Sequence, residues 1–114
     1  MTLRSPRRFP PYDRIIDLVA ERFRLTREAI LGADRHREIV LARHVAMYLC
    51  YRYCKNASYP TIGSTFSHRD HTTVRTAVLN IQSRLSKEPS LSVQVDAVRA
   101  AITREVFYSE NVRA

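Results

Sequence analysis

The segment from Tyr59 to Leu85 constrains the fold of this chain most, because a short helical pattern, a turn and a longer amphipathic pattern follow one another there. Pro60 suits the first turn of a helix, where a missing N–H costs no hydrogen bond. Ile62 and Phe66 are four residues apart and share one helical face. Gly63 lies between them, although a glycine inside a helix costs about 1 kcal/mol relative to alanine. We therefore expect a second helix to pass too close to Gly63 for a Cβ atom.

The second half of this segment predicts a helix that begins just after Asp70, with residues 67–69 as the turn. The Asp70 carboxylate can accept hydrogen bonds from the free N–H groups of the first helical turn. Apolar residues at helical spacing define the expected buried face: Val74, Ala77, Val78, Ile81 and Leu85. Thr72, Arg75 and Thr76 fall on the opposite face. Small hydrogen-bonding side chains on exposed first turns suit a helix that enters the DNA major groove, so the segment is predicted to be a helix-turn-helix.

The charge of the chain agrees with a nucleic-acid partner. The 114 residues include 19 Lys and Arg against 11 Asp and Glu, giving a net charge of +8 and a pI near 10.2. A hydrophobic content of 45% argues against disorder, and the length fits one domain. The sequence contains no apolar run long enough to span a bilayer and no signal-peptide pattern. The expected location is the cytoplasm, in association with the nucleoid, and no membrane partner is expected.

Three further helices are predicted before this segment. An apolar stripe indicates a helix over residues 13–23. Thr26 is expected to cap a short helix over residues 27–31, which Gly32 would end from a C′ position. A long apolar pattern over residues 37–53 predicts the central helix, against which the others pack.

The expected fold class is all-α, a helical bundle of about six helices. After a polar break, apolar residues from Leu91 to Val106 outline the last helix. The predicted organisation is a flexible basic arm (1–11), a helix-turn-helix domain (12–108) and a tail (109–114). The arm is interpreted either as a solvated tail or as a basic segment that contacts phosphates or the minor groove.

Two strings resemble the C-terminal duplex-binding domain of the bacterial replication initiator DnaA. They are IVLARHVAMYL, over Ile39–Leu49, and RDHTTV, over Arg69–Val74, the second after a Pro-x-Ile-Gly-x-x-Phe helix. The resemblance covers residues 12–85 clearly and the final helix loosely. It implies a Trp-repressor-like helical bundle that binds a short asymmetric site of the DnaA-box type. It also suggests a regulatory role in replication initiation or transcription, with the replication initiator as a partner.

The resemblance assigns DNA contacts to two groups of residues. The base-reading group is Arg69, Asp70, His71, Thr72 and Thr73. The backbone-contacting group is Arg35, Arg37, Arg43, Lys55, Ser58, Tyr59, Arg75 and Thr76. The chemistry of the first group is suitable, because threonine methyls fit the thymine methyl, aspartate accepts from the cytosine amino group, and histidine hydrogen-bonds purine N7.

Two positions depart from the family pattern. Leu41 stands where many members carry an arginine that enters the minor groove, so minor-groove reading is either absent or has moved to the N-terminal arm. Ser67 and His68 follow Phe66, where the family turn is usually led by glycine. A turn that requires a positive φ would be strained at these residues.

The sequence gives little support for nucleotide binding, metal binding or a disulfide bond. With Gly32 and Gly63 as its two glycines, the chain contains no G-x-x-x-x-G-K loop, so neither a nucleotide cofactor nor ATPase activity is expected. Cys50 and Cys54 are four residues apart, which is poor spacing for a zinc site and unfavourable for a disulfide within one helix. No metal is expected, and both thiols are expected to be reduced and mostly buried.

Two alternatives remain beside specific DNA binding. His68 and His71 flank Asp70, as acid–base catalysis would need, but no nucleophile accompanies them, so the chain is not expected to be an enzyme. A module that binds proteins of the replication apparatus, without specific DNA binding, is the second alternative. It would not require the RDHTTV surface.

Overall fold

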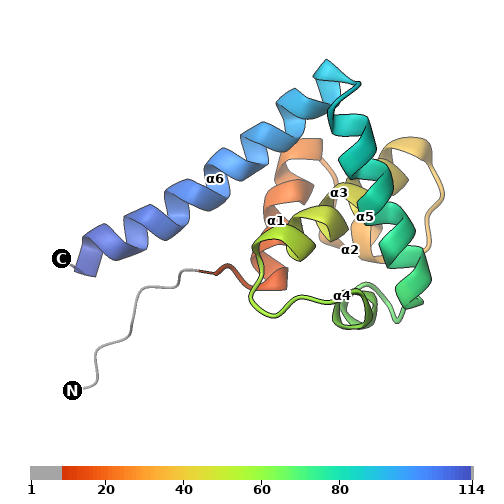
Figure 1. Cartoon of the computed structure of the whole chain (residues 1–114), viewed down its shortest axis with the longest axis horizontal. Helices are drawn as coiled ribbons and strands as arrows, with labels where there is room; N and C mark the ends of the chain where they lie inside the picture. Colours follow the sequence, from red (N-terminus) through yellow and green to blue (C-terminus); the bar gives the residue numbers. More distant parts are fainter. Residues whose placement is uncertain (1–8, 114) are drawn as a thin grey trace.

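The computed structural model describes the backbone of residues 9–113 and the side chains of residues 9–105. That part of the chain forms six helices and no strand (Figure 1). The helices are α1 (Tyr12–Phe23), α2 (Arg27–Leu31), α3 (Arg37–Tyr53), α4 (Tyr59–Thr65), α5 (His71–Leu85) and α6 (Pro89–Arg113). The predicted all-α fold is confirmed.

Helix α3 is the centre of the bundle, as its apolar pattern predicted. It packs against α1, α2, α4 and α5. Its residues from Val45 to Cys50 are all buried, because neighbouring helices cover it on several sides. A helix that is apolar on most of its circumference is expected only where other helices surround it.

Helix α6 packs against α1 and α5 and extends beyond the rest of the bundle (Figure 1). Leu91, Val95, Val98 and Ile102 are buried, which confirms the predicted stripe, whereas the side chain of Val106 lies outside the described residues. The helix continues to Arg113, so residues 109–113 are helical rather than an irregular tail. No glycine or proline follows Pro89, and the chain therefore carries no stop signal there.

The short helix α2 begins and ends as predicted, but its C-terminal cap differs. The Thr26 hydroxyl accepts a hydrogen bond from the Ala29 N–H at 3.0 Å. Helix α2 ends at Leu31 as predicted, but Gly32 is its C-cap residue and not C′, with a φ of −82°. The left-handed cap occurs instead after α1, where Arg24 has a φ of 57° and its N–H donates to the carbonyl of Glu21.

Gly63 is a point of close approach, as expected, although its neighbour is a turn and not the body of a helix. A Cβ atom at Gly63 would lie inside van der Waals contact of the Arg69 carbonyl oxygen, and 3.6 Å from Val74 Cγ2. The Arg69 N–H donates to the Gly63 carbonyl at 2.8 Å. Only glycine allows the turn to fold back onto α4 at this distance.

Most of the predicted arm, with Arg4, Arg7 and Arg8, lies outside the described residues. Of the part that is described, the Phe9 ring lies 6.0 Å from the Lys55 Nζ atom, next to the start of α4. No helix among the described residues combines the length and the apolar character that crossing a bilayer would require.

Gly63→Ala is expected to lower the free energy of unfolding by about 3 kcal/mol, because the added methyl group meets a backbone carbonyl that cannot move without opening the turn. Urea unfolding measures this loss. Ser64→Ala, an exposed site on the same helix, is the control and should change stability by less than about 0.5 kcal/mol. An unchanged midpoint for Gly63→Ala would show that the turn can shift away from α4.

Candidate nucleic-acid interface

Helix α4 begins with a reciprocal cap. The Ser58 hydroxyl accepts from the Thr61 N–H at 3.2 Å, and the Thr61 hydroxyl accepts from the Ser58 N–H at 3.0 Å. Pro60 lies in the first turn, as predicted. Tyr59 stacks on Tyr51 of α3, with ring centroids 4.8 Å apart and an interplanar angle of 16°. These contacts fix the start of α4 against the end of α3.

The turn between α4 and α5 is strained, as the missing glycines implied. Ser67 has a φ of 63° and His68 a φ of 56°, so two consecutive non-glycine residues occupy the left-handed region. Each such residue costs roughly 1–2 kcal/mol. The Ser67 hydroxyl donates to the carbonyl of Leu31 at the end of α2. The surrounding contacts therefore impose this conformation.

Arg69, expected to read bases, instead donates to backbone carbonyls inside the protein. Its guanidinium lies 2.8 Å from the Phe66 carbonyl oxygen, 2.6 Å from that of Gly32 and 3.4 Å from that of Leu31. The group is half-buried, and burial lowers its pKa. The expectation differs from the structure because two of these carbonyls, those of Leu31 and Gly32, come from another part of the chain, which a local motif does not reveal.

Arg43, expected to contact phosphate, is also directed inward. It is 5% exposed, and its Nε and Nη2 atoms donate to the carbonyls of Ile30 at 2.6 Å and Ala29 at 3.0 Å. Burial, followed by the positive charge of Arg69, lowers the pKa of Arg43, and the guanidinium nevertheless stays protonated. Together the two arginines satisfy the carbonyls of residues 29–32, which a helix C-terminus leaves without partners.

The tip of α5 is polar and exposed. Asp70 caps the helix as predicted, since its Oδ2 atom accepts from the Thr72 N–H at 2.9 Å, and this hydrogen bond lowers the pKa of the carboxyl group. His71, Thr72 and Thr73 are all exposed, whereas Val74 directly after them is fully buried. The base-reading group other than Arg69 therefore faces solvent, and the reverse side of α5 joins the core.

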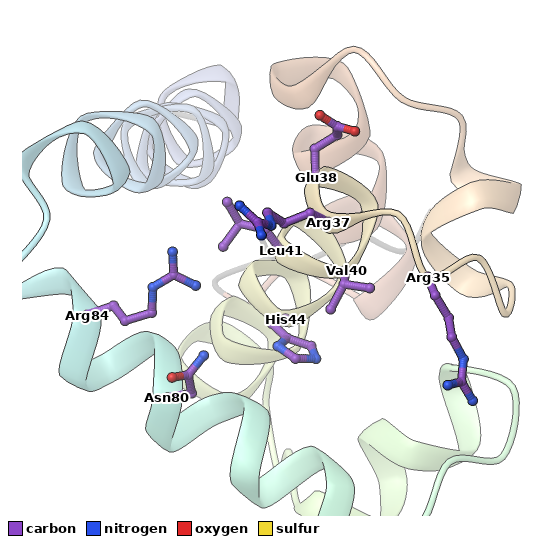
Figure 2. Close-up of a pocket in the computed structure, with 8 residues that line it drawn as sticks. All are labelled: Arg35, Arg37, Glu38, Val40, Leu41, His44, Asn80 and Arg84. Atoms are coloured by element: carbon purple, nitrogen blue, oxygen red, sulfur yellow. The ribbon is translucent and has the colours of Figure 1, made fainter.

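Arg35 and Arg37 are exposed at the start of α3. The loop before them is folded by Asp34, whose carboxylate accepts from the His36 N–H at 2.9 Å and contacts the His36 ring at 2.6 Å. The Asp34 carboxylate raises the pKa of His36. In Figure 2, Arg35 points toward the ribbon of α4 and the turn after it, while Arg37 points the other way.

The remaining members of the backbone-contacting group lie on α4 and α5 or just before α4. Lys55 is exposed, and Ser58 and Tyr59 are half-buried. Arg75 and Thr76 are exposed on the first two turns of α5. The structure thus has polar side chains along α5, with cationic groups at the start of α3 and before α4.

A groove between α3 and α5 adds two residues that sequence reasoning missed, Asn80 and Arg84 (Figure 2). The groove has a volume of about 690 Å³, and Arg35 and Arg37 line its other wall. Helical spacing from Thr73 and Thr76 could have suggested Asn80 and Arg84, but the pairing of α3 with α5 could not be read from the sequence.

The two thiols are free, as expected. Cys50 is buried and Cys54 is half-buried. Burial raises the pKa of Cys50 well above its usual value, and the hydrogen bond from Cys50 lowers that of Cys54. The described residues contain no cluster of three or more His, Cys, Asp or Glu side chains that could hold a metal ion.

Comparison with known proteins agrees with this geometry. The family described as "Bacterial dnaA protein helix-turn-helix" matches residues 12–81. The chromosomal replication initiator protein DnaA of Leifsonia xyli subsp. xyli is 40% identical over 88 residues, covering 77% of this chain and 18% of the relative. The protein of the same name from Acholeplasma laidlawii is 37% identical over 87 residues, covering 76% of this chain and 19% of the relative.

A third relative of the same name, from Clavibacter michiganensis subsp. michiganensis, is 36% identical over 110 residues. That match covers 96% of this chain and 23% of the relative. The chain therefore spans less than a quarter of the length of these relatives. Because the family match covers more than half of the 114 residues and includes α4 and most of α5, the chain belongs to the bacterial DnaA helix-turn-helix family of DNA-binding domains.

Proposed function

We propose that this chain binds double-stranded DNA sequence-specifically, at sites of the DnaA-box type. The observation that carries the proposal is the tip of α5, where His71, Thr72 and Thr73 are exposed while Val74 anchors the helix in the core. A helix with this polarity can enter the major groove without exposing apolar surface. These 114 residues would bind without catalysis and without a nucleotide.

Base reading is assigned to four residues, Asp70, His71, Thr72 and Thr73. The Oδ2 atom of Asp70 is used by the helix cap, and the second carboxylate oxygen remains to accept from a cytosine amino group. Arg69 is assigned a different role from the one that the resemblance implied. With Arg43, it holds the turn in place and acts as a positioning residue.

Backbone contacts are assigned to Arg35, Arg37, Lys55, Ser58, Tyr59, Arg75 and Thr76. Phosphate contacts fix the register of a protein on DNA but carry no direct sequence information. The family relationship and the net charge of +8 support this assignment.

The biological role proposed is regulation of replication initiation or of local transcription, by occupying sites that a replication initiator also uses. It follows from the name that the relatives carry, chromosomal replication initiator protein. Such a role places the chain in the cytoplasm with the bacterial nucleoid. Competition gel shifts with a box-containing and a scrambled duplex test whether the chain prefers such sites. Equal competition by both duplexes would favour the protein-interaction module instead.

Thr72→Ala is expected to cost roughly 1–3 kcal/mol on the preferred site and little on other duplexes, because the lost contact is to a base edge. Fluorescence anisotropy with the preferred and scrambled duplexes at one stated salt concentration measures the difference. Thr103→Ala, an exposed threonine on α6, should leave both affinities unchanged. A uniform loss on all duplexes would contradict base reading by Thr72.

Arg37→Ala should weaken binding to every duplex to a similar degree. The plot of log K against log salt should flatten by about one unit, because one fewer counterion is released from the DNA. Arg104→Ala, at an exposed site on α6, serves as the charge-matched control. An unchanged salt slope in Arg37→Ala would remove Arg37 from the phosphate-contacting set.

Arg43→Met should lower the free energy of unfolding by about 3 kcal/mol, since it removes two hydrogen bonds and leaves the carbonyls of residues 29 and 30 without donors. The salt slope of DNA binding should not change at temperatures where the variant is folded. Thermal melts and salt titrations together separate the two effects. A flatter slope with unchanged stability would instead support the phosphate contact implied by the resemblance.

A further inference from the structure

The groove between α3 and α5 is open, about 690 Å³ in volume and lined by side chains of both helices. Arg37, Leu41 and His44 line it from α3, and Asn80 and Arg84 line it from α5 (Figure 2). In this view His44 and Asn80 face each other across the groove, while Glu38 points to the side away from α5. The walls thus combine cationic and hydrogen-bonding groups with one carboxylate, that of Glu38, and an apolar patch at Val40 and Leu41.

The groove continues the polar face of α5. Thr73, Thr76, Asn80 and Arg84 are separated by three, four and four residues. They fall within an arc of about 80° on the helix and span roughly 16 Å along its axis. Because the major groove is about 12 Å wide, a stripe of this length that begins at base edges reaches the sugar–phosphate backbone beside them.

The charge of the groove is predominantly positive. Burial and then the positive charges of Arg43, Arg69 and Arg84 lower the pKa of His44. Arg84 is balanced by Glu88 one turn later, with Nε–Oε2 and Nη2–Oε1 distances of 2.7 and 2.9 Å. Both side chains of this pair are partly exposed, 35% for Arg84 and 41% for Glu88. A ligand phosphate can therefore compete with Glu88 for the guanidinium.

We infer that this groove binds the sugar–phosphate backbone of one DNA strand, with Arg84 and Asn80 as contacts and with Glu88 as an internal competitor for Arg84. The inference rests on the proposed DNA binding and extends it to the second half of α5. The Arg84 guanidinium exchanges the Glu88 carboxylate for a phosphate, and Asn80 donates to a neighbouring phosphate oxygen.

The test uses paired substitutions with opposite expected signs. Arg84→Gln should raise Kd for the preferred duplex roughly fivefold at low salt and flatten the salt slope by about one unit, with base preference unchanged. Glu88→Gln should lower Kd about twofold to fivefold, because it releases Arg84 for phosphate. The double variant should bind like Arg84→Gln alone, since Glu88 acts only through Arg84.

The Arg14–Glu105 pair, which joins α1 to α6, provides a matched control. Arg14→Gln and Glu105→Gln change the net charge by the same amounts, and neither should alter Kd or the salt slope by more than about twofold. Thermal melts confirm that all variants are folded. Hydroxyl-radical footprinting of the complex should show protected deoxyriboses beside the box that lose protection in Arg84→Gln.

Two results would overturn the inference. One is an unchanged salt slope and footprint in Arg84→Gln. The other is an equal gain in affinity for Glu88→Gln and Glu105→Gln, because the gain would then result from the change in net charge and not from the release of Arg84. The proposed sequence specificity is tested separately from the groove. Equal binding of a box-containing and a scrambled duplex would contradict base reading, whereas the footprint of Arg84→Gln would still show whether the groove contacts the DNA backbone.

Discussion

The contact between two arginine side chains and the end of a five-residue helix fixes the position of the turn before α5, next to the proposed base-reading residues. Arg43 and Arg69 donate to the carbonyls of residues 29–32. These carbonyls bear the partial negative charge of a helix C-terminus, and so they balance cations that have no carboxylate partner there. A helix as short as α2 is not stable alone in water. Its persistence therefore depends on α3 and on the turn before α5, and the three segments are ordered together.

The turn itself depends on this arrangement. Ser67 and His68 occupy left-handed backbone conformations that non-glycine residues rarely adopt, and the turn is held on one side by Gly63 and on the other by α2. The strain is therefore offset in part by contacts that come from outside the helix-turn-helix, such as the hydrogen bond from Ser67 to the Leu31 carbonyl. As a result, the direction of α5 is determined by the whole bundle and not by the motif alone.

Much of this fold could be predicted from the sequence, because helix periodicity and capping are local properties. Local patterns predicted the limits of α2 and α3, the caps at Thr26 and Asp70, and the close approach at Gly63. The inward direction of Arg43 and Arg69 was not predicted, since the carbonyls at the end of α2 that they contact lie 13 to 38 residues away in the chain. The family resemblance assigned DNA contacts to these side chains, and only tertiary packing reveals carbonyls that can replace water.

The candidate site, like the fold, could be predicted only in part. The exposed tip of α5 was predictable from amphipathic spacing, whereas the groove that contains Arg84 required the pairing of α3 with α5. Helix α6 extends to Arg113, beyond the predicted end of the domain at residue 108, in agreement with the lack of a glycine or proline after Pro89.

The anchoring of the turn also bears on the thermodynamics of association. Because contacts within the fold hold the turn before the proposed base-reading end of α5, conformational entropy of this turn is lost during folding and not during binding. The heat-capacity change on complex formation should therefore follow the apolar surface that is dehydrated at the contact, without the larger contribution that coupled folding adds.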